Sequence, residues 1–403
     1  MRSWISRAFG PSTLVAAAFI GPGTVTVCSL AGATSGFELL WALLFSTLAT
    51  LFLQEMSARL GLISRSGLGE ALRTSLNAPF LRISAAALVL SAIVVGNAAY
   101  EGGNLSGAAL GLGELLPQVS QSWRASAIGL AAFALLLTGS VKLVERVLIW
   151  MVVAMSVLFA ATAILLQPPP GPMLKGLFIP SFDNQHLLLV VGLIGTTVVP
   201  YNLFLHASTV QHKWKRAEDL KGLRMENAVS ILLGGLISMC IIVSSAVAFE
   251  GQPKGLATAA DMAVQLEPLL GPWARYAFAG GFFAAGLTSA LTAPLAAAYA
   301  ARGILGWRHS WTEPRFRAVW MGVLACGIGV SASGIRPVEV IRFAQVANGL
   351  LLPVIAGFLL TVMNRPELLG RHVNKPWQNA VGIVVVLCTI AIGAKALLTA
   401  FGG

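Results

Sequence analysis

Two short runs in this chain combine proline with residues that disturb a helix inside an apolar segment. The first is Gly21-Pro22-Gly23-Thr24, and the second is Thr196-Thr197-Val198-Val199-Pro200-Tyr201-Asn202. A proline within a helix removes a backbone hydrogen bond and clashes with the preceding turn, and glycine adds backbone freedom. Each run therefore predicts a helix that unwinds in mid-segment and leaves backbone groups free to bind a small ligand.

Polar side chains in other apolar segments are further candidates. Gln345 and Asn348 are amides three residues apart, so they share one face of a helix. Glu101 and His206 are titratable residues within apolar runs, which indicates a proton-linked role for each. The structural alternative for all four is a buried side chain that hydrogen-bonds to a neighbouring helix.

The predicted substrate-binding set comprises these amides together with the two proline-containing runs: Gly21, Gly23, Thr24, Thr196, Val199, Tyr201, Asn202, Gln345 and Asn348. The pattern contains no nucleophile–base pair, no phosphate-binding glycine loop and no cofactor motif. We therefore expect no catalytic residues and no cofactor, and the residues alone leave the metal ligands unassigned.

The composition places these runs in a membrane. The chain has 403 residues, of which 56% are hydrophobic and 11% are charged, whereas soluble domains carry about 25% charged residues. The mean hydropathy is +0.79. A soluble fold has too little interior for so much apolar surface, which excludes a soluble enzyme. The long continuous apolar runs also exclude a β-barrel, whose strands alternate over roughly ten residues.

Eleven runs are long enough to cross about 30 Å of hydrocarbon, for which roughly 20 residues are needed. Between the fifth and sixth runs, residues 167–172 are rich in proline and predict a loop. The whole of 1–403 is predicted to be one transmembrane domain. The predicted spans are 11–34, 38–58, 83–113, 123–141, 144–167, 186–210, 227–248, 273–301, 316–333, 338–363 and 377–400.

The positive charges predict the orientation of these spans. Most of the 27 Lys and Arg residues lie in the segments on one side of the membrane if the N-terminus is cytoplasmic. We therefore predict a multi-pass protein of a bacterial inner membrane, with a cytoplasmic N-terminus and an external C-terminus. The net charge of +11 then reflects contact with anionic lipid and does not indicate a nucleic-acid partner.

The two interrupted runs lie in the first and sixth spans, five spans apart. Because five is odd, spans one to five and six to ten form two halves of opposite topology, 11–167 and 186–363. The helix at 377–400 is extra. This arrangement is typical of transporters that bind substrate near the bilayer midplane, between paired broken helices.

On these motifs the chain resembles the Nramp family of proton-coupled divalent-metal transporters. Residues 31–41 are similar to the family's Ala-Gly-Ala…Gly-x-x-Leu-Leu-Trp, and residues 199–207 are similar to its Met-Pro-His-Asn-Leu-Tyr-Leu-His-Ser. The resemblance implies an all-α LeuT-type (APC) fold, with two inverted five-helix repeats, an eleventh helix and broken first and sixth spans.

The chain departs from the family at the ion ligands. The resemblance implies that an Asp and an Asn in the first break and a Met in the sixth helix bind the ion, with a backbone carbonyl. Here those positions are Gly21, Thr24 and Val199, and the carbonyl position is Thr196. A dication at the midplane without a carboxylate is costly, and the soft sulfur that selects transition metals is missing.

Three functions remain open on the sequence. The first is secondary transport of a divalent metal ion, magnesium-like more than manganese or iron. The second is proton-coupled transport of a carboxylate-bearing or anionic solute, because the starts of the half-helices near Val25 and Tyr201 favour anions. The third is a non-transporting sensor or scaffold. The predicted partners are a small solute or ion, the lipid bilayer and coupling protons, and the expected oligomeric state is a monomer.

Overall fold

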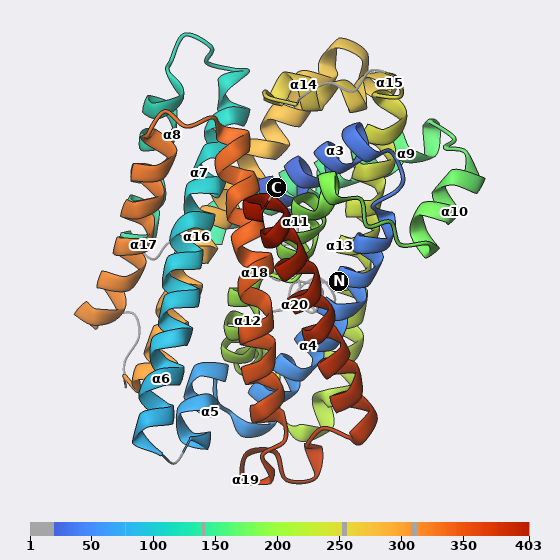
Figure 1. The fold of residues 1–403 in the computed structure, drawn as a ribbon. Coiled ribbons are helices and arrows are strands. Elements are labelled where there is room, and N and C mark those ends of the chain that lie inside the picture. Colours follow the sequence, from blue (N-terminus) through green and yellow to red (C-terminus); the bar gives the residue numbers. More distant parts are fainter. Residues whose placement is uncertain (1–19, 77, 139–141, 252–255, 308–312, 403) are drawn as a thin grey trace.

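The computed structural model is built from helices throughout the residues that it describes, which are 20–76, 78–138, 142–251, 256–307 and 313–402 (Figure 1). This confirms the predicted all-α class. The long helices are α3 (Pro22–Ser35), α4 (Leu40–Ser64), α6 (Pro79–Leu90), α7 (Gly96–Gly113), α8 (Gln121–Thr138), α9 (Lys142–Leu165), α11 (Leu187–Thr197), α12 (Pro200–Lys213), α13 (Leu220–Ala248), α16 (Ala274–Leu305), α17 (Pro314–Ala332), α18 (Pro337–Met363) and α20 (Pro376–Gly402).

Nine helical stretches within the described ranges are long and apolar enough to cross a membrane. Two predicted spans are not among the nine. One is α8, whose first turn carries Gln121, Ser122 and Arg124 and is therefore polar. The other is the first span, because its residues 11–19 lie outside the described residues and only α3 is seen. A π-helical turn, η1 (Ser91–Val95), joins α6 to α7 within the predicted span 83–113.

The sixth span is interrupted where its sequence predicted. Helix α11 ends at Thr197 and α12 begins at Pro200. Between them, Val198 has φ −99° and ψ 76°, and Val199 is extended at φ −76° and ψ 119°. The apolar segment is thus two short helices joined by a two-residue break.

Both predicted breaks place proline at the first position of the following helix. Pro22 begins α3 after an extended Gly21 (φ −86°, ψ 175°), and Pro200 begins α12. The missing N–H costs nothing at this position, because the first N–H groups of a helix have no intrahelical acceptor. Proline therefore starts a helix at both positions, and in the sixth span that helix is the second half of the span. The first half of the first span lies outside the described residues.

Short helices flank the two ends of the bundle. At one end lie α14 (Ala259–Ala263) and α15 (Glu267–Leu270), and at the other lie α5 (Leu68–Ser75) and α19 (Pro366–Leu369) (Figure 1). The prediction of a loop over residues 167–172 was wrong in part, because α10 (Pro170–Phe178) begins within it. Pro170 again takes the first helical position, so this proline-rich stretch supplies a helix start.

Small residues let the helices approach closely around α7 and α11. Helix α7 packs against α16, α17 and α18, and α11 packs against α18. A Cβ atom at Gly286 of α16 would meet the α7 backbone at Ala108 N at 2.6 Å. At Gly349 of α18, a Cβ would overlap the carbonyl oxygen of Val191 on α11. Such contacts replace the hydrophobic driving force that lipid does not provide between helices.

Gly349→Ala tests this close packing. The added methyl group must displace the α11 backbone, so we expect the free energy of unfolding to fall by roughly 1–3 kcal/mol, measured as a lower Tm of the detergent-purified protein. Gly357→Ala on the same helix is the matched control, because nothing lies within 4 Å of its Cβ position. Equal Tm values for the two variants would contradict this description of the α11–α18 interface.

Candidate substrate site at the helix breaks

A hydrogen bond between two threonines joins the two predicted breaks. Oγ1 of Thr24, in the first turn of α3, lies 2.9 Å from Oγ1 of Thr196, near the end of α11. The two residues are 172 positions apart in the chain, and both side chains are buried. The structure thus brings together two residues that the sequence assigned to one site from separate motifs.

The backbone at the second break finds partners of its own. The Val198 N–H donates to the Ile194 carbonyl at 2.8 Å, and the Asn202 N–H donates to the Val199 carbonyl at 3.0 Å. The hydroxyl of Thr50 on α4 donates to the Thr197 carbonyl at 3.3 Å. Thr50 was not among the predicted site residues, although a polar residue within an apolar span was a signal that could have found it.

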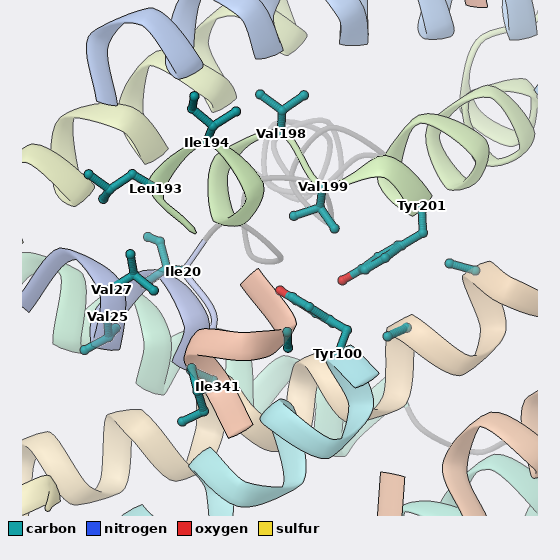
Figure 2. Close-up of a cluster of buried hydrophobic side chains, with 14 of the residues drawn as sticks. Ile20, Val25, Val27, Tyr100, Leu193, Ile194, Val198, Val199, Tyr201 and Ile341 are labelled. Carbon is teal, nitrogen blue, oxygen red and sulfur yellow. The ribbon is translucent and has the colours of Figure 1, made fainter. Parts of the chain in front are cut away.

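Two tyrosines face each other beside the break. The rings of Tyr100 on α7 and Tyr201 on α12 pack edge to face, with centroids 5.3 Å apart and planes at 65°. Figure 2 shows both side chains directed toward one another, with Val199 nearby. The Tyr201 hydroxyl is buried and has no hydrogen-bond partner among the described residues. This pair therefore places a phenol oxygen at the break that a ligand can use.

The amide of Gln345 reaches the same place from α18. A Cβ atom at Gly23 would overlap the Gln345 side-chain amide, and one at Gly195 would overlap the Gln345 carbonyl. Gln345 therefore lies between the start of α3 and the end of α11. Within the described part of the chain, its Oε1 and the Oδ1 of Asn202 are buried without a hydrogen-bond partner. These are two more neutral oxygens available to a ligand.

Asn348 lies on α18 one helical turn from Gln345 and faces α7. Its Oδ1 is 4.0 Å from the Cβ position of Gly96. Its Nδ2 is buried, with no partner among the residues described. The structure therefore places the Asn348 amide near the start of α7, and its predicted role in substrate binding stays a prediction.

Glu101 packs against α17. A Cβ atom at Gly327 of α17 would overlap Glu101 Cγ, and Asn104 donates to Glu101 Oε2 at 3.3 Å. No described residue hydrogen-bonds to its other oxygen, Oε1. The preceding residue, Tyr100, is the one that α7 turns toward the break. A proton-linked role for this buried carboxyl group stays a prediction.

His206 joins α12 to α4. Its Nδ1 lies 2.7 Å from Gln54 Oε1, and both side chains are buried. Nε2 of His206 has no partner within the described ranges. Gln54 was not among the predicted site residues, although a glutamine in the apolar span 38–58 was a signal that could have found it. The proton-path role predicted for His206 is not decided by this contact.

Charged and sulfur ligands are not gathered at the breaks. Among the residues that the structure describes, no group of three or more His, Cys, Asp or Glu side chains is placed to hold a metal ion. Gly21 offers no side chain, and Val199 is a buried hydrocarbon. The atoms at the breaks that could bind an ion are hydroxyl, phenol and amide oxygens, together with backbone carbonyl oxygens.

A sequence profile of the family described as Natural resistance-associated macrophage protein-like matches residues 12–399. The chain belongs to the Nramp family. This Nramp chain is 27% identical over 395 residues to the divalent metal cation transporter MntH of Klebsiella pneumoniae, covering 95% of this chain and 92% of the relative. It is 27% identical over 404 residues to MntH of Bacillus subtilis, covering 97% and 92% respectively.

Solved structures agree on the fold of this Nramp chain. The Eremococcus coleocola manganese transporter, crystallised with an aromatic bis-isothiourea substituted compound, matches with a TM-score of 0.77 at 20% identity, covering 97% of this chain and 86% of that one. MhsT in complex with L-phenylalanine matches with a TM-score of 0.63 at 14% identity, covering 97% and 98%. The predicted LeuT-type fold is confirmed, as is the prediction of a membrane transporter rather than an enzyme.

A double-mutant cycle tests the buried His206–Gln54 pair. Gln54→Leu leaves the imidazole Nδ1 buried without a partner, so we expect a loss of roughly 1–3 kcal/mol in the free energy of unfolding. His206→Leu should cost a similar amount, and the double variant should cost less than the sum of the two. Thermal unfolding in detergent measures all four proteins. Strictly additive losses would contradict the pairing.

Proposed function

We propose that this chain is a secondary transporter of a divalent metal ion that it holds through neutral oxygens, with part of the ion's water shell retained. The proposed preference is for a magnesium-like ion over manganese or iron. The relatives MntH of Klebsiella pneumoniae and Bacillus subtilis are divalent metal cation transporters, and they match this chain over nearly its whole length. We propose the same class of substrate here, with altered selectivity.

The observation that carries the proposal is the Thr24–Thr196 contact. Two hydroxyl oxygens 2.9 Å apart lie where the start of α3 meets the end of α11, and transporters of this architecture bind their substrates at such helix ends. The unpartnered oxygens of Gln345, Asn202 and Tyr201 belong to neighbouring positions. The donor set is therefore hard and uncharged.

The donor chemistry supports a magnesium-like preference. Mg²⁺ loses its water reluctantly and binds proteins through few direct ligands, so neutral oxygens that hydrogen-bond to bound water suit it. Thioether ligands favour softer ions, and Val199 supplies none. A bare transition-metal ion would need charged or sulfur ligands that the breaks do not offer.

The second candidate substrate is a carboxylate-bearing solute. Its support is that α3 and α12 both begin at the breaks, at Pro22 and Pro200. Each helix start carries about half a positive charge and unpaired N–H groups, which favour an anionic group. No acidic side chain of α3 or α12 offsets that field.

The arrangement in the membrane is part of the proposal. We infer a monomer with one domain, two inverted repeats over 11–167 and 186–363, and an extra helix at 377–400. The N-terminus is cytoplasmic and the C-terminus is external, as the Lys and Arg bias predicts. Transport is coupled to protons, with Glu101 and His206 as the titratable groups that the sequence assigns to the coupling.

Thr24→Val tests the substrate site. The variant removes one of the two joined hydroxyls, so we expect magnesium uptake into proteoliposomes to fall by about tenfold, the equivalent of ~1.4 kcal/mol. Thr26→Val is the matched control. Thr26 is on the same helix and is equally buried, with a hydroxyl that has no partner in the described residues, but it points about 200° away around α3.

The outcome separates the two candidate substrates. Magnesium uptake that is lost in Thr24→Val and kept in Thr26→Val supports the proposal. Equal uptake in the two variants would contradict a role for the Thr24–Thr196 pair. If small carboxylates are taken up and magnesium is not, the second candidate replaces the first.

Glu101→Gln tests the coupling. The substitution keeps the shape of the side chain but replaces the titratable carboxyl group with an amide. We therefore expect pH-driven uptake to lose its dependence on the proton gradient while the Tm stays within a few degrees. Glu114→Gln is the control, since Glu114 follows the end of the same helix and is not buried. Unchanged gradient dependence in Glu101→Gln would rule out its proposed role.

A further inference from the structure

A cavity of about 730 Å³ lies outside the predicted substrate-binding set, because among the described residues none of that set lines it. Its walls come from α4, from the start of α13, and from the segment formed by η6 (Gly370–His372) and the start of α20. These elements meet near the end of the bundle that carries α5 and α19 (Figure 1). The Lys and Arg bias predicts that this end is cytoplasmic. We call this space the α4–α13–α20 cavity.

The outer part of the cavity is cationic. Arg59, Arg224, Arg371 and Lys375 line it, with Glu55 as the one carboxylate among its lining residues. Glu55 is already shared, because Arg59 Nε lies 3.1 Å and an Arg224 nitrogen lies 2.8 Å from Glu55 Oε1. Arg371 and Lys375 make no ion pair with any residue that the structure describes. The lining of the cavity therefore carries a net positive charge.

Arg59 joins two walls of the cavity by hydrogen bonds. Its side chain is 2% exposed, and it donates to Asn374 Oδ1 at 2.8 Å and to the His372 carbonyl. These bonds fasten the η6–α20 segment to α4. The pKa of the His372 imidazole lies below its ordinary value because of partial burial and the positive charges of Arg371, Arg59 and Arg224. The local field is thus positive.

The inner part of the cavity is apolar. The lining changes from charged to apolar in the same direction along α4 and along α20. Along α4 the lining passes from Arg59 and Glu55 to Phe52 and Leu48, and along α20 it passes from Lys375 to Trp377 and Val381. Three of these apolar lining side chains are exposed: Leu48 by 51%, Trp377 by 58% and Val381 by 39%. The cavity lining is thus charged toward the end of the bundle that carries α5 and α19, and apolar toward the middle of α4 and α20.

One buried polar side chain in this wall has no hydrogen-bond partner among the described residues. Asn227 of α13 lines the cavity and is 1% exposed. Neither its Nδ2 nor its Oδ1 has a hydrogen-bond partner among the described residues. A buried amide without partners costs free energy, so a ligand in the cavity that both donates and accepts hydrogen bonds would restore what Asn227 lacks.

We propose that the α4–α13–α20 cavity binds an anionic phospholipid of the cytoplasmic leaflet. The phosphate lies against Arg224, Arg371 and Lys375, and the glycerol and headgroup hydroxyls reach Asn227. The acyl chains run along Phe52, Trp377 and Val381. Basic pockets between transmembrane helices on this side of a membrane are suited to anionic headgroups, and the apolar wall favours a lipid over free phosphate.

The bound lipid ties α20 to α4 and α13. Helix α20 is the extra helix outside the two repeats, and it is joined to α4 at this end through Arg59, His372 and Asn374. A phosphate between Arg371 and Arg224 adds a second link across the same gap. The lipid site is separate from the proposed substrate site, so the test of lipid binding does not depend on which substrate is transported.

Native mass spectrometry of the detergent-purified protein tests the proposal. Phosphatidylglycerol and phosphatidylcholine with identical chains are added separately, and the lipid-bound fraction is measured. We expect phosphatidylglycerol to bind at least about 30-fold more tightly, as two or three basic residues at a surface predict, and Arg371→Gln/Lys375→Gln to abolish most of the difference. Arg82→Gln/Arg315→Gln, which removes two exposed charges from the same predicted side, is the matched control.

Two further arms distinguish the source of the phosphate. Trp377→Ala removes part of the apolar wall and should weaken phosphatidylglycerol binding, whereas inorganic phosphate at millimolar concentration should neither raise the Tm nor displace the lipid. No preference for phosphatidylglycerol, or an equal loss in the control variant, would overturn the proposal. So would displacement by inorganic phosphate, which would make the cavity a free-anion site.

Discussion

A helix that is broken inside a membrane must satisfy the backbone groups that the break releases, because hydrocarbon offers them no water. This constraint organises the centre of the protein. The Thr197 carbonyl at the end of α11 accepts from Thr50, and the Val199 carbonyl accepts from the Asn202 N–H. Across the gap, the Thr24–Thr196 hydrogen bond holds the start of α3 against the end of α11. These partners stabilise the interruption at which we propose that the substrate binds.

The same constraint accounts for the packing around the breaks and for their chemistry. Glycines at 23, 195 and 349 allow α3, α11 and α18 to approach so closely that a Cβ atom would overlap a neighbour. Such close packing brings Gln345 to the breaks and leaves hydroxyl, amide and carbonyl oxygens there. Relatives of this chain are named as divalent metal cation transporters, whereas Gly21, Thr24 and Val199 stand at the positions to which the family resemblance assigns the ion ligands. The proposed hydrated ion, held by neutral oxygens, would reconcile the two.

Sequence patterns predicted the elements far better than the directions of side chains. Apolar run length and proline placement located the helices and the break at Val198–Val199, because both are local properties. The same patterns missed α10, since proline at a first helical position resembles proline in a loop. They could not show that Glu101 faces α17 while Tyr100 faces the break, because that depends on the rotation of α7 about its axis. Nor could they show the α4–α13–α20 cavity, whose walls come from three distant segments.

In the proposed site the replaced ligands, and not the fold, set the substrate. Isothermal titration calorimetry of the purified protein with manganese and with magnesium tests this claim most directly, beside the variant Gly21→Asp/Thr24→Asn/Val199→Met. The account predicts no measurable manganese binding and weak magnesium binding in the natural chain, and manganese binding in the variant. Micromolar manganese affinity in the natural chain would contradict the account.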